Sequence, residues 1–169
     1  RNNFITSTEN TATSSVNKLI NDYIFYYEKG LRAHKIGIPV GNFSSTALPE
    51  KVEGYYSRIY SKQLVLEALT AVQNFFEGKH YNSTTTGIGF KNYLKELERE
   101  DISTRIINQN TVAQTQISTL NADFYEQINT NDIAMLKAFD ELQKVVVLLK
   151  VDMLQAFNIS VDYADADGD

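Results

Sequence analysis

The sequence predicts an all-α protein, an up-and-down four-helix bundle that occupies residues 1–169 as a single domain. Apolar residues recur at spacings of three and four in four long segments, and short polar loops join these segments. Hydrophobic residues make up 43% of the chain, which is enough for a substantial core. Because short connections favour antiparallel neighbours, the helices are expected to run alternately up and down.

The first predicted helix runs from about residue 9 to residue 36 and ends in a turn rich in glycine and proline. Glycine takes positive φ without strain, so the series Gly37, Pro39, Gly41 predicts a shaped turn. Pro39 also disfavours the α region for Ile38. The apolar stripe of this helix consists of Val16, Leu19, Ile20, Tyr23, Ile24, Tyr27 and Leu31, and His34 continues it.

The middle of the chain predicts one short helix and two long ones. Pro49 suits the first turn of a short helix through Glu53, and Ser61 suits the N-cap of a helix that ends at Gly78. After a turn-rich connection, a near-heptad pattern over residues 88–124 predicts one helix of about 55 Å. The helix before Gly78 is expected to bury Leu64, Leu66, Ala68, Leu69, Val72, Phe75 and Phe76.

The last helix shows the most regular pattern, and a different kind of segment follows it. Asn129, Thr130 and Asn131 interrupt the preceding pattern. Over residues 159–163, apolar and polar residues alternate, which predicts a short strand or an extended arm. The apolar stripe of the last helix consists of Met135, Phe139, Leu142, Val146, Leu149, Met153 and Phe157. The acidic ending contains Asp162, Asp165, Asp167 and Asp169. We favour a solvated terminus over a calcium loop here, because the glutamate that closes an EF-hand is missing.

Composition excludes several classes of function. The net charge of −5, with scattered Lys and Arg, argues against nucleic acid as a partner. No run approaches the roughly 20 apolar residues that span a bilayer, so no transmembrane segment is expected. The absence of cysteine excludes disulfides and thiolate metal sites, and it suits an oxidising envelope.

Motifs for catalysis and metal binding are absent, so we assign no catalytic and no metal-ligating residues. The two histidines, His34 and His80, have no carboxylate at the spacing that would place both groups on one helical face. Neither His-x-x-Glu nor Gly-x-Ser-x-Gly occurs in the chain.

The candidate binding residues are those around the predicted turn: Arg32, His34, Lys35, Gly37, Pro39 and Gly41. One interpretation makes His34 a partly buried histidine that bonds a late helix carbonyl. The other joins His34 to Arg32 and Lys35 in a basic rim that faces a ligand or a partner domain. Six tyrosines allow two interpretations, a stacking platform for sugars or half-buried positions at the edge of the core, and the second is favoured. They are Tyr23, Tyr26, Tyr27, Tyr55, Tyr56 and Tyr60.

Four segments, in this order, resemble one known family. They are Tyr26 to Gly41, Ser44 to Tyr56 with the run Leu48-Pro49-Glu50-Lys51-Val52-Glu53, Leu64 to Gly78 followed by Ser83-Thr84-Thr85-Thr86-Gly87, and the ending from Val161. Their order is similar to the C-terminal half of imelysin-family proteins. The resemblance covers almost the whole chain.

The resemblance implies a bacterial envelope protein associated with iron acquisition, located in the periplasm or at the cell surface as an outer-membrane lipoprotein. It implies an N-terminal half of the same protein as partner. That half would carry the lipid anchor and the family's Gly-x-His-x-x-Glu motif, and it would hold most ligands for iron or another divalent metal. The family is classed with metallopeptidases. Because the motif is missing here, we expect no peptidase activity from this chain alone.

The residue pattern also supports a hypothesis of another class. In this alternative the chain is a stand-alone helical binding module, whose exposed bundle face or tyrosine-rich region holds a peptide, a glycan or a partner protein. The two hypotheses differ in whether the reading frame upstream of Arg1 encodes a bundle with His-x-x-Glu.

Overall fold

A computed structural model describes residues 1–44 and 46–163. Within these residues the regular structure is helical, and the single β pairing is an isolated bridge between Lys79 and Thr86. The prediction of an all-α protein is therefore confirmed. The last six residues, which include Asp165, Asp167 and Asp169 of the predicted acidic ending, lie outside the described residues.

Two of the helical runs combine α-helix with π-helix. The first consists of α2, η1 and α3, and the last consists of α7, η3 and α8, with η1 and η3 being π-helical. In chain order the elements are α1 (Asn2–Thr6), α2 (Ser15–Phe25), η1 (Tyr26–Gly37), α3 (Ile38–Val40), η2 (Pro49–Lys51), α4 (Ser61–Glu77), α5 (Phe90–Glu96), α6 (Glu100–Ser118), α7 (Phe124–Val147), η3 (Leu148–Met153) and α8 (Leu154–Phe157).

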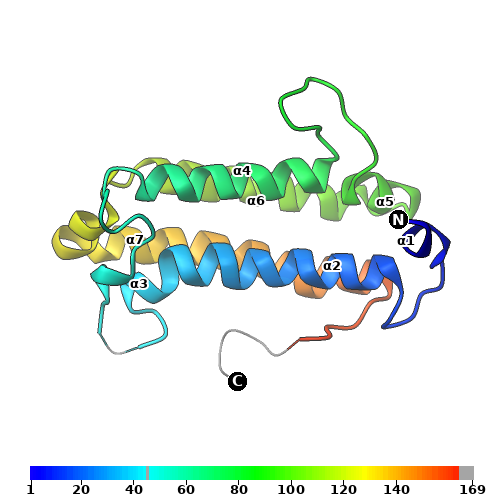
Figure 1. The fold of residues 1–169 in the computed structure, drawn as a ribbon, viewed down its shortest axis with the longest axis horizontal. Helices are drawn as coiled ribbons and strands as arrows, with labels where there is room; N and C mark the ends of the chain where they lie inside the picture. The colour runs from blue at the N-terminus through cyan, green and yellow to red at the C-terminus, as the bar shows by residue number, and fades with distance from the viewer. Residues whose placement is uncertain (45, 164–169) are drawn as a thin grey trace.

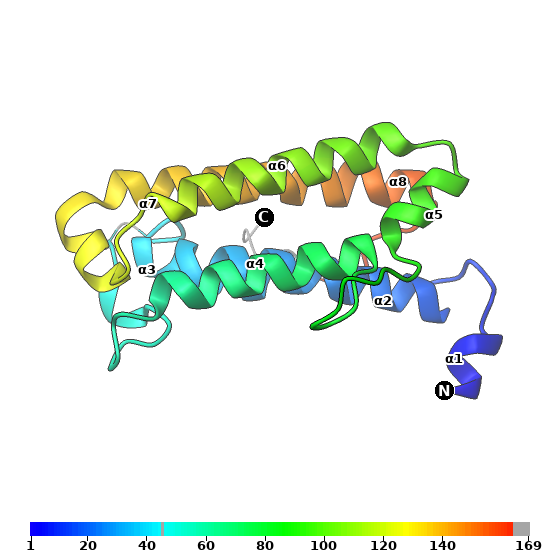
Figure 2. The same ribbon diagram turned by 90° about the horizontal axis from the view of Figure 1, so that it is seen from above.

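The long helices form two layers that share one apolar core. Figures 1 and 2 show α4 and α6 in one layer and α2 and α7 in the other, all running along the long axis. Helix α6 packs against α4 and α7, and η1 packs against the same two helices. The core receives fully buried side chains from every long helix, among them Ile24, Tyr27, Leu31, Leu69, Ile106, Met135 and Leu149.

The first helical run differs from its predicted bounds at both ends. It begins at Ser15 instead of residue 9, because the side chain of Asn17 bonds to Asn10 and Ser14 and holds the preceding chain outside the helix. At its other end the helix continues past Gly37 to Val40, and Ile38 keeps helical angles (φ −64°, ψ −50°). The expected effect of Pro39 on Ile38 is therefore wrong. Packing of α3 against η2 and α7 outweighs that local preference.

The two glycines of the predicted turn serve different purposes. Gly41 has φ +82° and ends the helix in the left-handed conformation, as expected. Gly37 is helical, and its requirement is space: a Cβ there would lie 2.5 Å from a ring carbon of Phe43 and 2.7 Å from one of Phe139. Gly37 thus allows a loop and a neighbouring helix to approach η1 closely.

The predicted helix over residues 88–124 is divided into α5 and α6. Glu98 has φ +57°, and the N–H of Arg99 donates to the carbonyl of Leu94 at 2.8 Å, which closes the end of α5. Leu94 and Ile102 on either side of this corner are both fully buried. The spacing of apolar residues therefore remains that of a helix across the corner. For this reason the sequence pattern does not reveal the corner.

The predicted break near residue 130 is confirmed as a kink inside α7. Asn131 has non-helical angles (φ −158°, ψ 78°), and its side-chain oxygen accepts from the N–H of Ala134 at 3.2 Å. Asn131 therefore acts as an N-cap for the second part of the helix.

Residues 159–163 leave the helix and return along α2 without forming a strand. We call this segment the C-terminal arm. The side-chain nitrogen of Asn21 (Nδ2) donates to the carbonyl of Ser160 at 3.1 Å. The side-chain oxygen of Asn21 accepts from the backbone N–H of Asp162 at 3.2 Å. One buried asparagine thus fixes the arm against the first helix.

The buried face of the last helical run generates a first prediction. Leu149 is fully buried, as the sequence pattern indicated, whereas Val151 is 57% exposed. Leu149→Ala should lower the free energy of unfolding by about 2–5 kcal/mol through lost burial and a cavity. Val151→Ala, the matched control, should change it by less than about 0.5 kcal/mol, as measured by urea denaturation. Equal effects of the two substitutions would contradict the assigned face.

The contrast between two glycines with positive φ generates a second prediction. A Cβ on Gly41 would lie 2.6 Å from the carbonyl oxygen of Thr46, whereas one on Gly54 (φ +72°) would meet only a Leu64 methyl at 3.5 Å. Gly54→Ala should cost about 1–2 kcal/mol for the left-handed backbone alone. Gly41→Ala should cost more, because it adds a collision with backbone. Thermal denaturation of both variants measures the difference, and a smaller loss at Gly41 would show that the turn yields.

Candidate functional site

Two charged side chains, Glu28 and Arg32, lie inside the bundle one turn apart on η1. Glu28 is fully buried, and Arg32 is 1% exposed. Arg32 Nη2 lies 3.6 Å from Glu28 Oε1, and Arg32 Nε donates to the Glu28 carbonyl oxygen at 3.4 Å. Because a buried charge is costly without counter-charge and hydrogen bonds, each of these side chains depends on the other.

The last helical run and the C-terminal arm supply further partners for this pair. Lys150 Nζ lies 3.4 Å from Glu28 Oε2, and the Tyr163 hydroxyl donates to the same oxygen at 3.0 Å. Arg32 Nη1 donates to Oε1 of Gln143. We call these five residues the charged core cluster. It joins η1 to α7, η3 and the arm.

Aromatic rings and π-helical backbone surround the charged core cluster. The guanidinium carbon of Arg32 lies 5.1 Å from the ring centroid of Phe139 and 5.6 Å from that of Phe43. Cations above ring faces are attracted by the ring quadrupole. The cluster's charged residues come from η1 and η3, and π-helix is rare and concentrated at functional sites.

The geometry of the charged core cluster suits structure more than catalysis. Both Glu28 oxygens face cations, and one also accepts from a hydroxyl, so this carboxylate is engaged by its own protein. It is also fully buried, so a substrate has no access to it in this conformation. The described part of the cluster therefore acts as an internal ionic network that fixes η1 against η3.

Two tyrosines of the first run add hydrogen bonds between the layers. The Tyr27 hydroxyl donates to Asn110 Oδ1 at 2.7 Å, and the Tyr23 hydroxyl donates to the Val72 carbonyl at 3.2 Å. Burial raises the pKa of both phenols, so both remain donors. These two tyrosines are core residues, as favoured above, but their hydroxyls bond to protein instead of water.

The structure separates the candidate binding residues of the first run. Arg32, Gly37 and Pro39 are buried, whereas His34 is exposed. His34 therefore does not continue the buried stripe, and it does not form one rim with Arg32. Lys35 forms an ion pair with Glu53. Gly41 is half-buried at the end of α3.

The described residues offer little to a metal ion. They contain no group of three or more His, Cys, Asp or Glu side chains placed to hold one. His80 lies in the loop after α4, exposed, with Nδ1 3.2 Å from the Thr85 hydroxyl.

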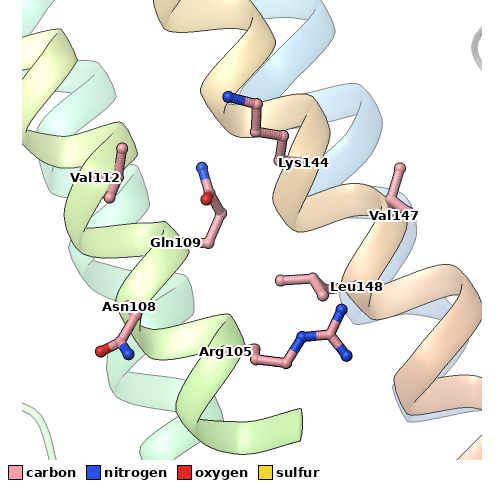
Figure 3. Close-up of a pocket in the computed structure, with 7 residues that line it drawn as sticks. All are labelled: Arg105, Asn108, Gln109, Val112, Lys144, Val147 and Leu148. Carbon is pink, nitrogen blue, oxygen red and sulfur yellow. The ribbon is translucent and has the colours of Figure 1, made fainter.

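A first open groove, of about 480 Å³, lies between α6 and the last helical run. Figure 3 shows Arg105, Asn108, Gln109 and Val112 on one side and Lys144, Val147 and Leu148 on the other. Its polar groups largely bond to acids beside them. Arg105 Nη1 lies 3.3 Å from Asp152 Oδ1, and hydrogen bonds from Lys144 and Gln109 lower the pKa of Glu141. This groove therefore shows no converging set of reactive groups.

A second groove, which we call the apolar groove, lies between α2 and α4 and extends to α5. Its two sections, of about 340 and 550 Å³, share Leu19 and Phe75. Phe75 was expected in the core, but it is 49% exposed, because Val65, Ala68, Leu69, Val72 and Phe76 form the buried face of α4. Other residues that line the groove include Phe4, Val16, Tyr23, Tyr26, Ile88 and Tyr93.

Comparisons with protein families, curated proteins and solved structures found no match. The resemblance to the imelysin family therefore stays a prediction. No helix among the described residues has the length and apolar character to cross a membrane.

The charged core cluster generates a third prediction. Arg32→Ala should lower the free energy of unfolding by about 3–5 kcal/mol, because Glu28 would lose a buried counter-charge. The control is Arg105→Ala, which removes a guanidinium that is 54% exposed and paired with Asp152. It should cost less than about 1 kcal/mol. Similar losses for the two variants in chemical denaturation would show that burial of Arg32 does not matter.

Proposed function

We propose that this chain is the C-terminal bundle of an imelysin-like bacterial envelope protein associated with iron acquisition, and that it works by binding another helical half. In this proposal its long helices form an up-and-down four-helix bundle. The ordered segments of resemblance and the helical bundle-like fold support the assignment.

The observation that carries the binding role is the apolar groove. Among the residues that line it, Phe75, Ile88 and Phe4 are 49%, 92% and 51% exposed. Amphipathic helices of partner proteins lay their apolar faces into grooves lined by apolar side chains, so this groove is a suitable place for a partner helix. A helix of the N-terminal half is the occupant that the resemblance supplies.

The proposal assigns different tasks to the two halves. The N-terminal half would hold iron or another divalent metal through its His-x-x-Glu residues, and this chain would provide a rigid docking face. Of the predicted binding segment, the exposed His34 would be free to face the other half, while Arg32 supports the fold from inside. A stand-alone binding module remains the alternative, in which the same groove takes an unrelated protein.

The fourth prediction tests this docking role. The upstream reading frame should encode a bundle with His-x-x-Glu, and that bundle, expressed separately, should bind this chain in titration calorimetry. Phe75→Glu should weaken the affinity at least tenfold, about 1.4 kcal/mol, because it places a charge in the apolar groove. Ile133→Glu is the control, since Ile133 is 62% exposed on α7 and does not line the groove.

Two results would contradict the proposal. An upstream sequence without such a bundle would remove the imelysin-like assignment and leave the stand-alone module. Binding that is equally affected by both substitutions would show that the other half docks elsewhere. Thermal denaturation should show both variants folded at the assay temperature. Phe75→Glu should melt somewhat earlier than Ile133→Glu, because the Phe75 ring packs on Tyr23 and Phe90.

A further inference from the structure

The loop that leads into α4 carries an unusual density of exposed aromatic and apolar side chains. Tyr56 is 99% exposed, Ile59 is 62% exposed, and Tyr60 is 50% exposed. Tyrosine and arginine are the residue types that most often dominate binding energy at protein interfaces, together with tryptophan. Both types occur together in this loop.

Arg58 lies beside two tyrosine rings, Tyr55 of this loop and Tyr125 of α7. Its guanidinium carbon lies 4.1 Å from the ring centroid of Tyr125 and 5.6 Å from that of Tyr55. The Tyr55 centroid lies 5.8 Å from that of Tyr125 and 5.3 Å from that of Tyr56. The three tyrosine rings therefore adjoin one another, and the cation lies against two of them.

Arg58 has no carboxylate partner among the described residues. The ion pairs found among the described residues involve other cations. Examples are the pairs of Arg32 with Glu28 and of Arg99 with Asp101. A guanidinium stacked on rings keeps N–H donors at its edge, and these match a carboxylate in a bidentate manner. The loop thus presents an exposed cation that makes no ion pair with a carboxylate of the described residues.

Backbone hydrogen bonds fix the loop before any partner arrives. Arg58 has φ +55°, and its N–H donates to the Gly54 carbonyl at 2.8 Å. The hydroxyl of Ser61, a residue 1% exposed, lies 2.9 Å from the carbonyl oxygen of Glu53 and 3.1 Å from that of Arg58. A preformed loop loses little conformational entropy on binding, which favours affinity. A non-glycine residue held at positive φ also fits a functional role.

We infer that the loop from Gly54 to Tyr60, together with Tyr125, docks an acidic segment of a protein partner. We call it the tyrosine–arginine surface. An Asp or Glu of the partner would bind the Arg58 guanidinium, and apolar side chains next to it would pack on Tyr56 and Ile59. Charge complementarity with Arg58 selects the acidic partner.

This inference is independent of the proposed function. The loop precedes the first residue of α4, whereas the larger section of the apolar groove includes Gly78 and the loop after α4. The two surfaces therefore lie at different ends of one helix, and a partner can occupy either without the other.

The fifth prediction uses the acidic peptide Ac-GEFEELFEG-NH2 and its neutral counterpart Ac-GQFQQLFQG-NH2 as probes. Fluorescence polarisation with labelled peptides should show binding of the acidic peptide at least tenfold tighter than of the neutral one. Arg58→Asn should remove that difference while keeping the fold, because asparagine tolerates positive φ. Arg105→Gln is the control, since Arg105 is an exposed arginine on α6, and it should leave binding unchanged.

Several outcomes would overturn the inference. They are equal affinity for the two peptides, no binding of either, and unchanged binding to Arg58→Asn with a native melting temperature. A second variant, Tyr56→Ser, should also weaken binding at least tenfold, because it removes a ring on which the partner packs. Tyr56 is 99% exposed, so the substitution should leave the fold intact. If inorganic phosphate competes with the acidic peptide at equal concentration, the surface is a phosphate site and the protein-partner assignment is wrong.

Discussion

Burial of the Glu28 carboxylate is the constraint on which much of the structure depends. A charge without solvent needs donors, and those of Glu28 come from its own helix, from η3 and from the C-terminal arm. The first and last helical runs therefore have to lie in a defined register. The rings of Phe43 and Phe139, which approach Gly37 closely, are also the rings that contact the Arg32 guanidinium.

The helical class and most buried stripes could be predicted from the sequence, because burial imposes a period that survives in the residue order. Leu149 and Phe139 were identified as core residues in this way. The same period of apolar residues does not show whether a helix continues without a break. Leu94 and Ile102 keep helical spacing across the corner at Glu98, so one long helix was predicted where the chain folds back.

The candidate site was less accessible to prediction, because it depends on contacts between distant segments. Glu28 and Arg32 look like an ordinary surface pair at i and i+4. A signal was present, since Ile20, Ile24, Glu28 and Arg32 continue one row at spacings of four. The contributions of Lys150 and Tyr163 had no such signal, because only the fold brings them beside residue 28. His34 lies next to the glycine–proline series in the sequence, but the structure leaves it at the surface, away from the buried pair.

The contact between Tyr163 and Glu28 also has a consequence for biosynthesis. These residues are separated by 135 positions, so a ribosome completes the first helix well before the tyrosine exists. Until then the Glu28 carboxylate of the nascent chain lacks one of the donors that it has in the folded protein. Helices can form as they emerge, but closure of the interior has to wait for translation to reach the arm. The burial of Glu28 with all of its donors is therefore expected only after the last helical run and the arm have been made.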